Sequence, residues 1–194
     1  MRSCRKPGLP GFVFVGFLLA LAAGCSPHLD WREHRAPELG FIVALPDKPQ
    51  TVAREVDYGG PGGPLKLPMT MVSTGVGPSL FAVGVATLPP AALAAPAELD
   101  AAVGWFREAL LRNVQGRQTA AGTVTLAVPP GRKWRTAQTL RASARAGRDG
   151  APAVLAARFV VVDDRLYQLV ALGAESQLTA AVLDTFFDSF RLLP

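Results

Sequence analysis

The sequence predicts an α+β protein in which a mostly antiparallel sheet is flanked by two main helices. Short apolar segments bounded by Gly and Pro predict the strands, and several of these segments alternate apolar and polar residues. Two longer segments repeat apolar residues at helical spacing. Since strands precede and follow the first helix instead of alternating with helices, an antiparallel sheet with helices on its faces is favoured.

The first half of the chain predicts four strands, at 41–45, 51–58, 65–73 and 80–88. Pro46 ends the first of them, and the Gly- and Pro-rich segment 59–64 predicts a turn. This turn lacks the Lys-Ser/Thr ending of a phosphate-binding loop. In the fourth strand, Ala82, Gly84 and Ala86 share one face, which would let a helix approach closely.

The first helix is expected over Pro96–Val114, since Pro is favoured in the first helical turn. Its apolar residues form one continuous stripe, made of Leu99, Val103, Phe106, Leu110 and Val114. Trp105 projects away from that stripe. We interpret it either as a partly covered surface residue or as a contact point for a partner.

The second half predicts a strand within 118–128 and further strands at 132–143, 154–162 and 165–172. Trp134 and Leu140 are expected on one face of the second of these strands. Asp163-Asp164 predicts a tight hairpin between the last two, whose nearly continuous apolar sequences are typical of central strands covered on both faces. A closing helix is expected over Ser176–Phe190, with Ser176 as its N-cap.

Residues 1–24 have the layout of an export signal, with Arg2, Arg5 and Lys6 before the short apolar segment 12–22. The small residues before Cys25 resemble a lipobox, the signal-peptidase II site of bacterial lipoproteins, although Ala22 stands where Leu is preferred. We therefore expect cleavage between Gly24 and Cys25, and lipid on the Cys25 thiol. The alternatives are an ordinary secretory signal and a retained transmembrane anchor.

This interpretation divides the chain into a signal peptide (1–24), a lipidated polar tether (25–37) and one domain (38–194). Two or three acyl chains, palmitate among them, would anchor Cys25 stably in a membrane. Ser26 after the Cys favours the periplasmic face of the outer membrane if the source is Gram-negative. The expected location is the cell envelope.

The formal net charge of +5 overstates the basicity of the mature chain, because three of its 20 basic residues lie in the leader. The remaining 17 basic and 15 acidic residues give no electrostatic footprint for nucleic acid. Seven basic residues and one acid nevertheless lie between positions 132 and 158. They predict either an anionic-surface patch or exposed strand faces that resist edge pairing: Arg132, Lys133, Arg135, Arg141, Arg145, Arg148 and Arg158.

No catalytic constellation is recognisable, and we expect no enzyme activity, no metal and no cofactor. Past residue 37 the chain has no His and no Cys, which excludes Ser-His and Cys-His nucleophile pairs. His28 and His34 lie in the expected tether without further ligands nearby. The carboxylates at 163–164 and at 184 and 188 are interpreted as turn formers and as a solvated helix face.

Four segments resemble, in order, motifs of the PsbP-like family: Phe41–Pro49, Pro130–Arg132, Asp163–Gln168 and Phe186–Phe190. Together they resemble the PsbP-like α/β/α sandwich in its bacterial exported and lipoprotein branch, over about residues 38–194. Ala127-Val128 departs from the family, which often has Gly and an aromatic residue there. The resemblance implies an accessory or docking module and supplies no functional residue to carry over.

The leading hypothesis is a non-catalytic lipoprotein that docks an envelope protein. The alternative is a carrier of a small apolar or anionic ligand between helix and sheet. A large apolar pocket would favour the carrier. A filled core with an exposed apolar patch would favour docking.

Overall fold

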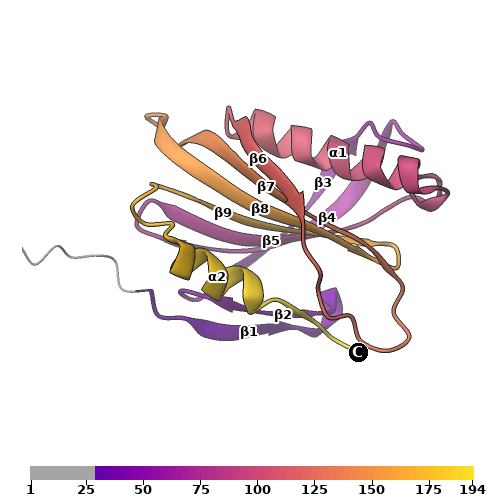
Figure 1. The fold of residues 1–194 in the computed structure, drawn as a ribbon, viewed down its shortest axis with the longest axis horizontal. Helices are drawn as coiled ribbons and strands as arrows, with labels where there is room; N and C mark the ends of the chain where they lie inside the picture. Colours follow the sequence, from indigo (N-terminus) through magenta and orange to yellow (C-terminus); the bar gives the residue numbers. More distant parts are fainter. Residues whose placement is uncertain (1–28) are drawn as a thin grey trace, which may run out of the picture.

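The computed structural model of the chain describes residues 29–194 as two sheets and two main helices (Figure 1). The larger sheet has seven strands in the order β3-β4-β5-β9-β8-β7-β6, and every neighbouring pair is antiparallel. Its strands are β3 (Gln50–Tyr58), β4 (Leu65–Val76), β5 (Ser79–Thr87), β6 (Arg117–Thr123), β7 (Trp134–Ala146), β8 (Ala151–Val162) and β9 (Arg165–Gly173). The predicted fold class is confirmed.

The second sheet is small and lies with the closing helix on one face of the larger sheet (Figure 1). It has the order β1-β2-β10, with strands β1 (Arg32–Ala36), β2 (Phe41–Leu45) and β10 (Arg191–Leu192). The closing helix is α2 (Ala180–Asp188). Residues 32–36, which the sequence assigned to the tether, pair along their whole length with β2. The ordered structure therefore begins earlier than residue 38.

Helix α1 (Pro96–Asn113) covers the opposite face, which gives the protein two separate hydrophobic cores. Between α1 and the sheet lies the first core, in which four members of the predicted stripe are buried: Leu99, Val103, Phe106 and Leu110. Phe81, in the second core, lies edge-on to Phe186 of α2 and to Trp31, with ring centroids 5.4 and 5.5 Å apart. Two short 3-10 helices (Pro37–Leu39 and Pro90–Leu93) complete the elements.

The central strands β8 and β9 supply both cores at once. Phe159 and Leu166 are buried in the first core, whereas their chain neighbours Val160 and Tyr167 are buried in the second. This explains the continuous apolar sequences that predicted central strands, because both faces of these strands are covered. The predicted two-residue hairpin is also present, since Val162 pairs with Arg165 and Asp163 has a φ of 55°.

Two local expectations are wrong. Trp134 and Leu140 lie on opposite faces of β7, because a bulge at Arg135 shifts the register between Trp134 and Thr136. Trp134 pairs with Val162 of the second core, whereas Leu140 belongs to the first. The N-cap of α2 is Thr179, not Ser176, and its hydroxyl accepts from the amide of Val182 at 3.4 Å.

The strand expected within 118–128 is β6, which begins at Arg117 and ends at Thr123. Val124 still donates its amide to the Ala137 carbonyl at 3.1 Å. The chain then leaves the sheet for the Pro129–Gly131 turn. Within residues 29–194, no helix combines the length and the hydropathy needed to cross a bilayer.

Candidate functional site

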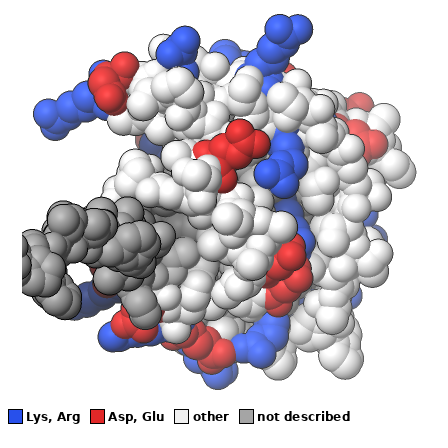
Figure 2. All heavy atoms as spheres, turned by 60° about the vertical axis from the view of Figure 1, so that its left-hand side comes forward, with Lys and Arg blue, Asp and Glu red and all other residues white. Residues whose placement is uncertain are grey.

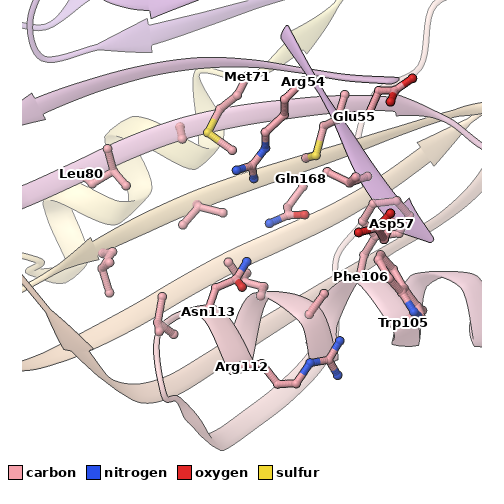
Figure 3. A pocket seen from close by; sticks show the side chains of 18 residues that line it. Arg54, Glu55, Asp57, Met71, Leu80, Trp105, Phe106, Arg112, Asn113 and Gln168 are labelled. Carbon is pink, nitrogen blue, oxygen red and sulfur yellow. The ribbon is translucent and has the colours of Figure 1, made fainter. Parts of the chain in front are cut away.

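A groove of about 400 Å³ lies between α1 and the strands β3, β4, β5 and β9, and we call it the α1 groove (Figure 3). A helix with its side chains is about 10–12 Å wide. Seven strands about 4.8 Å apart make a much wider face, so a single helix leaves part of it uncovered. The volume is at the lower end of the range of small-molecule sites, about 300–1,000 Å³.

The floor of the α1 groove is apolar and comes from three neighbouring strands: Met69, Met71, Leu80, Ala82, Val170 and Leu172. Gly84 lies in the same face, and a Cβ there would displace the Met69 methyl group that packs over it. Phe106 and Leu110 of α1 form the opposite wall. The two thioether side chains can adapt to ligands of different shape.

Trp105 is a half-buried residue at one end of the α1 groove. Its ring lies edge-on to Tyr58 at a centroid distance of 5.1 Å, and edge-on to Phe106 at the same distance. The indole nitrogen also approaches Gly59, where an added Cβ would be 3.2 Å from it. Of the two interpretations from the sequence, the partly covered surface residue fits this packing.

Gln168 is the polar side chain of the floor, and it is 7% exposed. It lies on the central strand β9, between Gly84 of β5 and Phe159 of β8. Among residues 29–194, no group hydrogen-bonds its side-chain amide. Figure 3 shows the amide directed into the α1 groove. The residue as a whole is buried, but its amide nitrogen and oxygen are not fully enclosed, so the amide is accessible to water or a ligand in the α1 groove.

Charged residues lie at the rim of the α1 groove. Arg54 comes from β3 and Arg112 from the last turn of α1, and both side chains are exposed. Glu55 and Asp57 also border it, but strand alternation places them on the face of β3 opposite to Arg54. Asp57 is paired with Lys66 at 3.3 Å.

Tyr58 packs beside Trp105 at one end of the α1 groove. The pKa of Tyr58, beside Trp105, is raised by burial and by the nearby Glu98. A phenol with a raised pKa stays protonated at neutral pH and is a poor base. Within the described residues, no three His, Cys, Asp or Glu side chains are grouped as metal ligands would be.

The basic residues singled out by the sequence do not form one patch. Arg135 and Arg145 are ten positions apart on β7, which separates their Cα atoms by about 33 Å. Arg158 pairs with Asp188 of α2 at 3.1 Å, and its guanidinium lies 4.8 Å from the centroid of the Phe187 ring. On the face of the molecule shown in Figure 2, basic side chains are interspersed with acidic ones.

Arg132 and Arg135 stabilise the β8–β9 hairpin. The Asp163 carboxylate accepts from the amide of Lys133 at 2.7 Å and forms an ion pair with Arg132. Arg135 donates to the Asp163 carbonyl at 3.0 Å, and Arg132 also donates to the Leu193 carbonyl at 3.1 Å. Arg145 donates to the Gly150 carbonyl within its own hairpin, whereas Lys133, Arg141 and Arg148 are exposed.

Gly24 and Cys25, the expected cleavage and lipidation site, lie outside the described residues. Gln168, Arg54 and Arg112 were not expected from the sequence. Gln168 had a signal, because it is the polar residue inside the apolar segment 166–172. The two arginines gave no such signal in the sequence, since most arginines on strands and helices are exposed.

No protein-family model matches the chain, and no curated protein sequence matches it. Among solved structures, it is similar to the solution structure of cyanobacterial PsbP (CyanoP) from Synechocystis sp. PCC 6803. The TM-score is 0.50 at 14% sequence identity, and the alignment covers 90% of this chain and 98% of that one. The chain therefore has a PsbP-like fold.

The first prediction concerns Gln168. Since its amide has no partner among the described residues and is accessible from the α1 groove, Gln168→Met should leave the free energy of unfolding unchanged or raise it by up to about 1 kcal/mol. Urea denaturation measures the change. A decrease of similar size would show that the amide has a structural partner. Gln138→Met is the control, because the Gln138 amide donates to Asp100 at 3.2 Å and its loss should not stabilise the fold.

The second prediction concerns Asp163, whose pKa is lowered from its usual 3.8 chiefly by the Lys133 amide and then by Arg132. The ionised carboxylate therefore stabilises the fold above that usual value, and the stabilisation is lost as the pH falls through the lower, folded-state pKa. Asp163→Asn tolerates the positive φ and should lower the free energy of unfolding by about 1 kcal/mol at about pH 7.

The same comparison at about pH 2.5 should give a smaller difference between Asp163→Asn and the unsubstituted chain. Urea denaturation at both pH values checks this. An equal difference at both values would contradict the role of the Asp163 charge. Asp164→Asn, at the exposed neighbouring position, is the matched control and should change little at either pH.

Proposed function

We propose that this chain is a non-catalytic binding protein that holds a small, largely apolar molecule in the α1 groove. The observation that carries the proposal is the Gln168 amide, which faces an apolar groove and has no hydrogen-bond partner among the described residues. Binding sites commonly combine apolar walls with a few polar groups that fix orientation. A ligand oxygen would give this amide its missing hydrogen bond.

The groove favours the carrier over the docking module. Of the large apolar side chains in residues 29–194, those with high exposure are Val52, Leu80 and Trp134. Leu80 lines the α1 groove, and Trp134 lies on the other face of the sheet. This scattered exposure is less than the contiguous patch that a protein-docking surface usually presents.

The proposal includes the membrane anchor on Cys25. Strand β1 begins at Arg32, seven positions after Cys25, and seven extended residues span at most about 25 Å. A lipid on this residue would therefore keep the domain close to the bilayer surface. That location suits a carrier whose cargo comes from or goes to a membrane.

The third prediction tests the α1 groove with a neutral apolar dye, N-phenyl-1-naphthylamine, whose fluorescence rises in apolar sites. The chain from residue 25 onward, with Cys25→Ser so that no bound lipid competes, should bind the dye. Both hydrophobic cores lie within this chain. Ala109→Phe, which projects into the α1 groove from α1, should weaken binding at least about tenfold by filling the space.

Ala101→Phe is the matched control, because Ala101 is exposed on the same helix and does not line the α1 groove. It should leave dye affinity unchanged. Equal affinity of both variants, or an absence of dye binding by the unsubstituted site, would refute the proposed function. Circular dichroism of each variant checks that the fold is retained.

The fourth prediction tests the anchor. In a bacterial host fed with radiolabelled palmitate, the natural chain should incorporate label, and Cys25→Ser should abolish it because the thioether-forming thiol is gone. Mass spectrometry of the natural chain should give a mature form that begins at Cys25. An unmodified chain, or label that persists in Cys25→Ser, would contradict the anchor. Neither result would bear on ligand binding in the α1 groove.

A further inference from the structure

We infer that the ligand of the α1 groove is a single-chain anionic amphiphile, whose acidic headgroup is bound at the rim by Arg54 and Arg112. This inference rests on the proposed function and specifies its ligand class. The hydrocarbon chain would lie on the apolar floor. The shared headgroup chemistry is a carboxylate or phosphate, which guanidinium groups bind well.

Arg54 points to the groove side of β3 because of the alternation of that strand. Val56 and Tyr58, two and four residues later, pack into the first core, so Arg54 shares their face. Arg54 has no ion-pair partner among residues 29–194. The side chain is seen beside Met71 at the groove in Figure 3. It is therefore a cation at an apolar groove that lacks a counter-ion.

Arg112 supplies a second cation from the other side of the groove. It lies in the last turn of α1, again without an ion-pair partner in the described part of the chain. The C-terminal end of a helix carries a partial charge of about −0.5, which would weaken anion binding. Two guanidinium groups outweigh it, so the rim remains attractive to an anion.

Polar donors lie between the two arginines. In Figure 3, Gln168 and Asn113 are seen between Arg54 and Arg112 in projection, and both amides can donate as well as accept. A headgroup at the rim would bring oxygen atoms to the Gln168 amide. The apolar side chains of the floor would meanwhile cover the chain, contributing about 0.8 kcal/mol per buried methylene.

The charge distribution of the rim decides against a cationic ligand. The acidic residues that border the groove, Glu55 and Asp57, lie on the opposite face of β3, and Asp57 is already paired. The groove also lacks a cage of aromatic rings around a central space, since Trp105 and Phe106 pack against each other and against Tyr58. The charged and aromatic residues of the α1 groove therefore favour an acidic ligand over a cationic one.

The test compares four ten-carbon probes that differ in the headgroup: decanoate, decyl phosphate, 1-decanol and decyltrimethylammonium. Calorimetry and intrinsic tryptophan fluorescence, to which Trp105 at the groove contributes, measure their binding to the chain from residue 25 with Cys25→Ser, below the concentrations at which micelles form. Decanoate or decyl phosphate should bind at least about tenfold more tightly than decanol, and the cation should bind most weakly. Tighter binding of decanoate would indicate a free fatty acid, and tighter binding of decyl phosphate a phospholipid headgroup.

Variants locate the charge. Arg54→Gln and Arg112→Gln should each reduce the preference for the acid over decanol several-fold, and Arg54→Lys should restore part of it. Arg141→Gln, which removes an exposed arginine from the other face of the sheet, is the matched control and should change nothing. Added salt should weaken the binding of the acidic probes and leave the binding of decanol unchanged.

The outcomes separate the two proposals. If decanol binds as tightly as the acids to the unsubstituted site, the anionic headgroup is refuted whether or not the arginine variants fold. If Ala109→Phe still blocks the binding of the dye and of decanol in that case, the α1 groove binds neutral apolar ligands and the proposed function stands. If no probe and no dye binds, the proposed function itself fails.

Discussion

Burial of both faces of the seven-stranded sheet is the constraint on which the rest of the structure depends. Strands β8 and β9 send successive residues alternately into the two cores, so neither core can form without the sheet. A shift of one residue in their pairing would exchange the two sets of side chains. The Asp163-Asp164 turn opposes such a shift, and the contacts of Arg132, Lys133 and Arg135 stabilise it.

The two faces are covered unequally, and this inequality creates the α1 groove. One face receives α2 together with the three-stranded sheet, and aromatic rings fill the space between, including Phe81, Phe186 and Tyr167. The other face receives α1 alone. The strands β3, β4 and β5 therefore keep apolar side chains that only partly meet the helix. The Gln168 amide faces this uncovered space, where water can reach it.

The sequence predicted the elements whose patterns are local. The stripe of α1, the central pair β8–β9 and their two-residue turn all follow from residue spacing and composition. Strand β1 was missed because its sequence, Arg-Glu-His-Arg-Ala, is polar at every position but the last. It is a strand because β2 offers it hydrogen-bond partners along its length, which depends on the tertiary structure. The bulge at Arg135 was likewise invisible, since a single extra residue leaves composition unchanged.

The candidate site could not be predicted because it depends on where α1 lies over the sheet. Arg54 and Arg112 are 58 positions apart, and no periodicity relates a residue of β3 to one at the end of α1. Of the two interpretations of the basic residues between 132 and 158, the single anionic-surface patch does not fit their positions in the fold. They are close in sequence, yet strands as long as β7 separate them, and Arg158 is occupied by Asp188 and Phe187.

The chain enters the domain on the face that the α1 groove does not occupy. Trp31 packs against Phe81 in the second core, and β1 follows directly in the small sheet, beyond the large sheet as seen from α1. Packed layers are about 10 Å apart, so the sheet and the β1–β2 layer stand between the entry of the chain and the opening of the groove. A ligand that passed between a surface on the N-terminal side and the α1 groove would therefore have to move around the edge of the seven-stranded sheet.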